Sequence, residues 1–214
     1  MTKIQKKPTR PRTKPPQVRR EELLDAAEKL FLARGIAATS VDAIVAGADV
    51  AKGTFYLHFA SKEQLLAALR QRFIDDYCSE VNAAVGKCRA DDWTGRLGAW
   101  VAAGVDGYLD HHALHELVFH EFRPERRHAT HRNSTVEHLS LLLAAGNSAG
   151  AWSVENPSLN ATMLFHALHA ALDEAAGRKS STDRNKLVRA LQTFFERALA
   201  LPSGAIPHGA RPVL

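Results

Sequence analysis

Residues 39–66, which read TSVDAIVAGADVAKGTFYLHFASKEQLL, constrain this chain more than any other stretch. They predict two short helices joined by a tight turn, followed by a third, longer helix. The middle helix is short and polar. Because Phe55 and Phe59 are four residues apart, they share one face and can fix this helix to its neighbours. Other positions carry hydrogen-bond donors such as Lys52 and His58. A short helix held by two aromatic side chains, with donors facing outward, suits the reading of DNA.

Positive charge is concentrated near the N-terminus. Residues 1–70 contain 13 Lys and Arg against 7 Asp and Glu, a net charge of +6, whereas residues 71–214 contain 15 and 16, a net charge of −1. Residues 1–16 hold six basic side chains and four prolines, so we expect them to form a disordered basic arm. This distribution suggests a polyanionic partner. A solvated basic tail without a ligand would have the same composition.

Several classes of protein do not fit the sequence. No run of 18 apolar residues is present, so no membrane span is expected. The basic N-terminus is not followed by the apolar segment of a secretory signal. Cys78 and Cys88 lie ten residues apart in a helical pattern, about 15 Å along a helix, which is too far for a disulfide. These features indicate a reduced, cytoplasmic protein.

Apolar residues recur at helical spacing along the rest of the chain, and no segment alternates as a strand does. We therefore expect an all-α fold. Its predicted divisions are a basic arm (1–16), a three-helix helix-turn-helix domain (17–62), a helical domain for ligand binding and dimerisation (63–201) and a loose tail (202–214). The last two helices, at about 159–176 and 183–200, have wide apolar faces that predict contact with both a core and a second subunit. The expected interface residues recur four apart: Leu168, Leu172, Leu191 and Phe195.

Residues 39–66 resemble the DNA-binding region of the TetR family of bacterial transcriptional repressors. About fifteen positions agree in register, including Thr39-Ser40-Val41, Lys52-Gly53-Thr54-Phe55-Tyr56 and Ser61-Lys62. The chain departs from the family at Asp49, where Gly is frequent, and at Ala51, where Ser or Asn is frequent. Ala51 offers no side chain to cap the third helix.

The resemblance implies a DNA contact surface on the short helices. In it, Gly53 lets the backbone approach DNA, and Thr54 and Lys52 contact base edges or phosphates. Contacts to phosphates alone are expected of Tyr56, His58, Ser40 and Lys62. Two alternatives remain open, because Tyr56 would also fit a buried aromatic position and His58 a plain surface histidine.

The resemblance also implies a ligand-responsive regulator of transcription. Specifically, it implies a repressor that a small molecule releases from its operator. The expected partners are a pseudo-palindromic DNA duplex, a second copy of the chain and a small-molecule effector, without a cofactor or an enzymatic activity. Aromatic and histidine side chains suggest a largely apolar ligand with a few polar anchors. The candidate pocket residues are Trp100, Tyr108, His115, Phe119, Phe122, Trp152, Phe165, His166 and His169.

Two other chemistries have partial signals. His111 and His115 are four residues apart, and His166 and His169 are three apart. The alternative is therefore a metal-responsive regulator, or a helical protein that binds a small molecule or a metal through the His-rich region. A zinc-protease motif fails, because the histidine after His115 is five residues on rather than four. The Gly146–Gly150 segment spells the hydrolase pattern G-x-S-x-G, but a helix precedes it instead of the required strand. We interpret its glycines as a helix stop.

Overall fold

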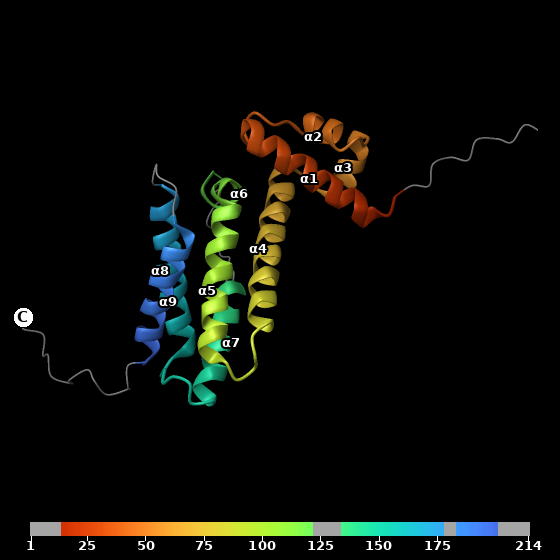
Figure 1. The fold of residues 1–214 in the computed structure, drawn as a ribbon. Helices are drawn as coiled ribbons and strands as arrows, with labels where there is room; N and C mark the ends of the chain where they lie inside the picture. Colours follow the sequence, from red (N-terminus) through yellow and green to blue (C-terminus); the bar gives the residue numbers. More distant parts are fainter. Residues whose placement is uncertain (1–13, 122–133, 178–182, 201–214) are drawn as a thin grey trace, which may run out of the picture. The chain divides into compact units, whose positions relative to one another are not determined.

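The computed structural model describes residues 14–121, 134–177 and 183–200, and these fold entirely as helices and connecting turns (Figure 1). The chain divides into two compact units, residues 1–69 and residues 70–214. α4 begins in the first unit and continues into the second. The elements are α1 (Pro16–Arg34), α2 (Val41–Gly47), α3 (Lys52–His58), α4 (Lys62–Gly86), α5 (Trp93–Asp110), α6 (His112–Glu116), the π-helical turn η1 (Leu117–Glu121), α7 (Ser134–Ser148), α8 (Pro157–Ala176) and α9 (Arg184–Ala200). The predicted all-α class is confirmed. The predicted tail and most of the predicted arm lie outside the described residues.

The first unit is built on the apolar stripe of α1. Leu23, Leu24, Ala27 and Phe31 are almost completely buried, as their helical spacing predicts. Gly35 ends the helix with a φ of 80°, a left-handed conformation that glycine adopts without strain. α1 packs against both α2 and α3, so these two short helices have a firm base.

The turn between α2 and α3 has the conformation expected at Asp49, the one described non-glycine residue with a positive φ, 52°. Thr39, with Asp42 three residues later, has the sequence pattern of a capping box for α2, but the structure differs from this expectation. Ser40, not Thr39, is the N-cap, and its Oγ accepts a hydrogen bond of 3.1 Å from the Ala43 amide. Thr39 is buried and its hydroxyl donates to the Gly35 carbonyl at 2.8 Å. Thr39 therefore stabilises the α1–α2 turn instead of the helix start.

α4 begins with a capping box of Ser61 and Gln64, which their spacing of three residues predicts. The Ser61 Oγ accepts from the Gln64 amide at 3.3 Å, and the Gln64 side chain accepts from the Ala60 amide. Further along, Leu65, Leu66 and Leu69 are buried. The start of α4 is thus an integral part of the first unit, which extends to residue 69 rather than ending at residue 62 as the sequence suggested.

The second unit is a helical bundle with one hydrophobic core. α7 packs on α8, and α5 packs on both α8 and α9 (Figure 1). Asn156 and Pro157 begin α8, as expected of a capping residue followed by proline at the first helical position. The Asn156 side chain accepts a hydrogen bond from the Leu159 amide at 3.0 Å. No helix in the described part of the chain is long and apolar enough to cross a membrane.

The four expected interface residues belong to this core. Leu168, Leu172, Leu191 and Phe195 are all buried within one chain, so their side chains are not available to a second subunit. The prediction for these residues was wrong because the α8 and α9 faces that carry them pack on the other helices of the same chain. The large apolar side chains that stay exposed on α8 and α9 are Leu159, Met163 and Phe194, each with just over half of its surface accessible.

Candidate functional site

α3 is held to the first unit by one aromatic face. Phe55 is fully buried, and Phe59, directly after the helix, is 2% exposed. Their rings lie 5.7 Å apart. Ala51 precedes the helix without any side-chain cap, as the sequence predicts. The remaining faces of α3 are therefore free to contact another molecule.

Lys52 and Tyr56 share an outward face of α3. Tyr56 is 54% exposed, which excludes the buried position that its sequence also allowed. The Lys52 ammonium forms an exposed ion pair of 2.7 Å with Asp42 of α2, and this hydrogen bond raises the pKa of Lys52. Gly53 lies beside them, with no atom within 4 Å of the place that a Cβ would occupy. A phosphate or base edge can approach the backbone at Gly53.

Two predicted phosphate contacts have structural roles. The Lys62 ammonium donates to the Ile36 carbonyl at 2.8 Å and to the Thr39 carbonyl at 3.0 Å. It joins the start of α4 to the α1–α2 turn and keeps at most one N–H for another partner. The Ser40 hydroxyl accepts its cap bond and can still donate to an anion. Contacts of Ser40 and Lys62 with DNA stay predictions.

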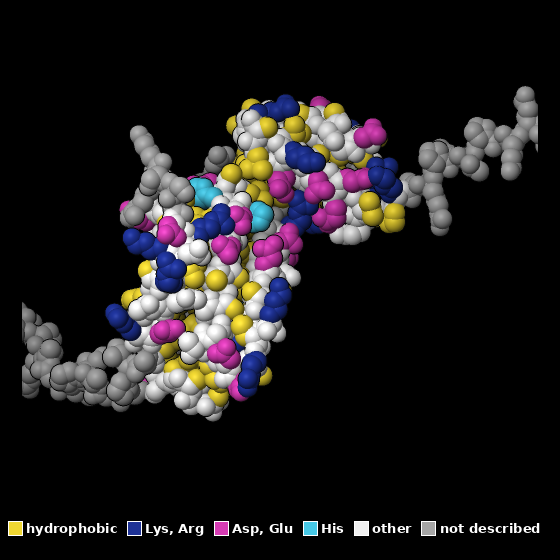
Figure 2. Space-filling view, in the orientation of Figure 1, with side chains coloured by type: hydrophobic (Ala, Val, Ile, Leu, Met, Phe, Trp, Pro, Cys, Tyr) yellow, Lys and Arg dark blue, Asp and Glu magenta, His cyan; other side chains and the backbone are white. Residues whose placement is uncertain are grey.

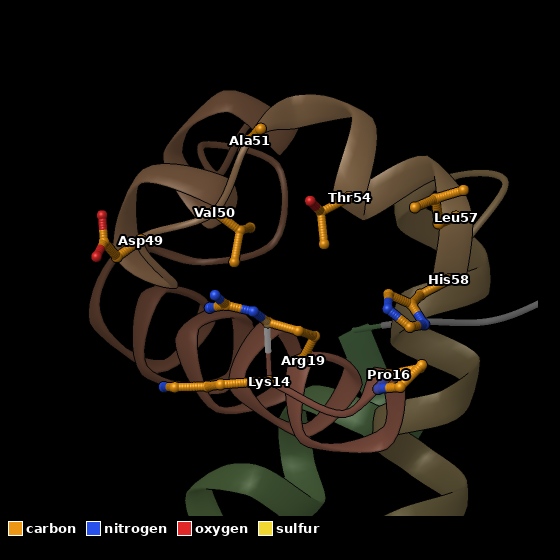
Figure 3. A pocket seen from close by; sticks show the side chains of 9 residues that line it. All are labelled: Lys14, Pro16, Arg19, Asp49, Val50, Ala51, Thr54, Leu57 and His58. Carbon is orange, nitrogen blue, oxygen red and sulfur yellow. The ribbon is translucent and has the colours of Figure 1, made fainter. Parts of the chain in front are cut away.

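A hollow of about 460 Å³ lies between α3 and the beginning of α1 (Figure 3). Thr54, Leu57 and His58 line it from α3, while Lys14 and Arg19 line it from the opposite side. The complete lining is Lys14, Pro16, Arg19, Asp49, Val50, Ala51, Thr54, Leu57 and His58. Three of these side chains, those of Lys14, Arg19 and His58, can be cationic and one, Asp49, is acidic, so the lining is cationic on balance and favours an anionic ligand.

Acidic side chains moderate the charge of this surface. Glu22 of α1 pairs with Lys14 and with Arg19, at 2.9 Å for the latter, and these hydrogen bonds lower the pKa of the Glu22 carboxyl. Blue and magenta side chains are accordingly interspersed over the first unit in Figure 2. A polyanion would have to compete with Glu22 for both cations.

Sequence reasoning missed two residues of this surface. Leu57 is 82% exposed, although leucine normally signals a core position. Arg19 reaches the hollow from α1, whose apolar stripe forms the core of the first unit. The i, i+3 spacing of Thr54 and Leu57 was the available signal, since it places both on one face.

A second cluster, of aromatic and imidazole rings, lies in the second unit. Tyr108 is close to His115 and His169, with ring centroids 4.6 and 5.7 Å away. Phe165 packs on His169 at 4.2 Å, and Phe119 on His115 at 4.8 Å. These five residues, predicted as pocket residues, do come together. They come from α5, α6, η1 and α8, so the π-helical turn forms part of this cluster.

The cluster contains a few polar groups in a largely apolar setting. The Tyr108 hydroxyl donates to Asp173 at 2.5 Å, while burial, followed by this hydrogen bond, raises the pKa of the tyrosine. Burial lowers the pKa of His169, against smaller opposing effects of the Phe165 carbonyl and Asp173. A neutral His169 can both donate and accept a hydrogen bond.

The other predicted pocket residues lie elsewhere. Trp100 is buried in the bundle core beside Phe195. Trp152 packs on Gly146 and Trp93, and its indole N–H donates to the Leu143 carbonyl. His166 is exposed. Phe122 lies outside the described residues. Aromatic composition did not separate core positions from cluster positions.

The histidine pairs do not converge as metal ligands. His111 ends α5 and is exposed, whereas His115 is buried on α6, so one continuous helical face does not hold both. His166 is exposed while His169 is half-buried. Within the described ranges, no three His, Cys, Asp or Glu side chains are arranged to hold a metal ion. The hydrolase-like segment ends α7 at Ser148, and Gly150 turns the chain with a φ of 73°.

Comparison with known proteins agrees with the geometry of the first unit. Residues 23–69 match the family model described as bacterial regulatory proteins, tetR family. The repressor KstR2 of Mycobacterium tuberculosis is 32% identical over 123 residues, which are 56% of this chain and 58% of that protein. The activator FasR of Mycolicibacterium smegmatis is 37% identical over 106 residues, 49% of this chain and 47% of that protein. The chain thus matches only about half of the length of these relatives.

Solved structures extend the likeness in fold to most of the chain. The fatty acid degradation regulator FadR from Bacillus halodurans superposes with a TM-score of 0.68 at 21% identity, covering 92% of this chain and all of that one. A protein of unknown function from Rhodococcus sp. RHA1 gives a TM-score of 0.72 at 22% identity over 86% of this chain and 96% of that one. Residues 23–69 are therefore similar to the TetR family of bacterial regulatory proteins, and most of the chain shares the fold of these solved structures.

Proposed function

We propose that this protein is a transcriptional regulator that binds a specific double-stranded DNA sequence through α3. The observation that carries the proposal is the exposed face of α3, whose donors project from a short helix fixed by Phe55 and Phe59. The match of residues 23–69 to the family model and the names of the relatives, which are transcriptional repressors and an activator, support it.

A binding-site selection with the full-length protein tests this proposal. We expect one duplex motif to be enriched from a randomised library. Tyr56→Ala should weaken binding to all sites about equally, because a phosphate contact carries no sequence information. Thr54→Ala or Lys52→Ala should also alter the enriched motif. Failure to enrich any motif would contradict sequence-specific binding.

The operator is expected to be pseudo-palindromic because the regulator acts as a homodimer. Two copies of α3 would then enter successive major grooves, about 34–36 Å apart. Leu159, Met163 and Phe194 expose apolar surface on α8 and α9 and support a subunit contact there. Leu159 and Met163 lie four residues apart, on one face of α8.

The contact surface can be tested by adding charge to it. Met163→Glu and Phe194→Glu should give folded monomers in light scattering, because neither side chain is part of the protomer core. Leu141→Glu is the matched control, since Leu141 is also an exposed apolar residue, at 67%, but lies on α7. A wild-type protein that is monomeric at micromolar concentration would contradict the homodimer.

The effector site of this regulator is the ring cluster of Tyr108, His115, Phe119, Phe165 and His169. Its apolar rings and few hydrogen-bonding groups support a largely apolar small molecule. α4 supports the coupling to DNA, because Leu65 and Leu69 lie in the core of the first unit, while the Phe73 ring contacts His115 at a tilt and Phe119 edge-on in the second unit. Coupling free energies between such sites are typically about 1–3 kcal/mol, or about 5- to 150-fold in affinity. A repressor released by its effector is the proposed mode.

A screen of apolar compounds by thermal shift, followed by release from the selected duplex, tests the effector site. His169→Ala should abolish the response, whereas His166→Ala, on the exposed face of the same helix, should retain it. Compounds that bind tightly to the protein and leave its DNA affinity unchanged would contradict the coupling.

A further inference from the structure

The most outward position of α3 is occupied by an apolar side chain. At about 100° per residue, the direction midway between Phe55 and Phe59 lies about 180° from Leu57. Since the two phenylalanines face the core, Leu57 points directly away from it. Gly53 and Thr54 flank Leu57 on this outer face, and neither carries a charge.

Leu57 is the most exposed large hydrophobic residue among those described, at 82%. The side chain contributes almost nothing to the core of the first unit. Helix formation does not explain it either, because Lys, Arg, Gln and Glu have nearly the same helix propensity as Leu. An apolar residue in this place is therefore suited to an apolar group on another molecule.

The surroundings of Leu57 indicate which molecule that is. Lys14 and Arg19 lie across the same hollow, and His58 is beside it on α3 (Figure 3). Such a setting favours a polyanion over an apolar protein surface. In the major groove of duplex DNA, the one apolar group that distinguishes the bases is the 5-methyl of thymine.

We propose that Leu57 reads the 5-methyl group of a thymine in each half-site of the operator. This inference rests on the proposed DNA-binding function and adds the chemistry of base selection to it. Thr54 is the rival reader, because it also carries a methyl group and shares this face. Lys52 lies on another face and is paired with Asp42.

The test replaces thymine by deoxyuridine, which removes the methyl group and keeps the base-pairing edge. The duplex enriched by full-length protein is remade with each thymine changed in turn, and affinity is measured by fluorescence anisotropy. Replacing the contacted thymine in one half-site should weaken wild-type binding about fourfold, and replacing it in both half-sites about fifteenfold. These factors are expected when the contact with one or with two methyl groups is lost.

Variants then assign the methyl contact to a residue. Leu57→Ala should bind the thymine and deoxyuridine duplexes equally, whereas Leu57→Met should keep a preference for thymine. Leu32→Ala, which truncates an exposed leucine of α1, should behave as wild type. Thr54→Ser, which removes only the threonine methyl, should keep the preference for thymine over deoxyuridine whatever its overall affinity for DNA. Folding is not at risk in Leu57→Ala, because the side chain is outside the core.

The outcomes separate the inference from the function. A specific duplex whose binding is indifferent to deoxyuridine would overturn thymine reading while leaving DNA recognition intact. A deoxyuridine effect that persists in Leu57→Ala and vanishes in Thr54→Ser would overturn the role of Leu57. If no duplex is enriched at all, the result contradicts both the proposed DNA-binding function and the inference that rests on it.

Discussion

Replacing Lys62 by Met separates two roles that this side chain can have. The Lys62 ammonium donates to the Ile36 and Thr39 carbonyls at 2.8 and 3.0 Å and is half-buried. Hydrogen bonds from charged groups contribute about 1.5–3 kcal/mol each. Because water can reach this site and partly replace the lost donor, we expect Lys62→Met to destabilise the first unit by about 2–3 kcal/mol in all. The methionine retains most of the aliphatic stem.

Urea unfolding of the full-length protein, with hydrogen exchange of residues 36–60 to localise the change, measures this effect. Lys52→Met is the matched control, since the Lys52–Asp42 ion pair is exposed to solvent and should contribute little to stability. We expect faster exchange around the α1–α2 turn in Lys62→Met alone. Unchanged stability, together with a shallower salt dependence of DNA binding, would refute the structural role and favour a phosphate contact.

Four further predictions concern other sites. Gly53→Ala should stabilise the protein by about 0.5–1 kcal/mol, since the added Cβ meets nothing within 4 Å. The same Cβ should weaken DNA binding, because it keeps DNA from approaching the backbone closely. A melting curve measures the change in stability, and fluorescence anisotropy measures the change in DNA affinity. Gly146→Ala should destabilise the bundle by about 1–3 kcal/mol, because its Cβ would lie 2.1 Å from the Trp152 ring; unchanged tryptophan fluorescence and stability would contradict this. Glu22→Gln should raise DNA affinity and steepen its salt dependence by freeing two cations, whereas an unchanged salt slope would mean that the cations do not meet DNA. Burial lowers the pKa of His169 below the ordinary 6.5, so the unfolded chain binds the proton more readily than the folded chain. The stability contributed by neutral His169 should therefore be complete above pH 6.5 and should fall as the pH drops below it. His169→Gln should flatten this pH dependence in urea unfolding.

Much of the first unit was predictable because its local signals are strong. The aromatic pair on α3, the glycine after α1 and the capping box of α4 each depend on residues close in sequence, and the structure confirms them. Asp49 adopts a left-handed conformation, which aspartate tolerates in tight turns. Such features follow from backbone geometry within a few residues.

Features that depend on distant packing were not predictable in the same way. Lys62 binds carbonyls 26 and 23 residues earlier, and no local pattern reveals that contact. α8 and α9 are apolar on more than one face, so the periodicity of the sequence did not show which face packs on the chain's own core. Leu168 and Phe195 proved to be core residues for this reason. Likewise, Trp100 and Tyr108 were both predicted to line the pocket. Only the packing of α5 shows that Trp100 lies in the bundle core and Tyr108 in the ring cluster.

The affinity of the full-length protein for its selected duplex, compared with a scrambled duplex of equal length at physiological salt, tests the central claim most directly. Specific recognition through α3 predicts at least about a thousandfold tighter binding to the selected duplex and an affinity for both duplexes that falls steeply with salt. Equal affinity for the two duplexes, or binding that random DNA removes completely at low salt, would contradict the account.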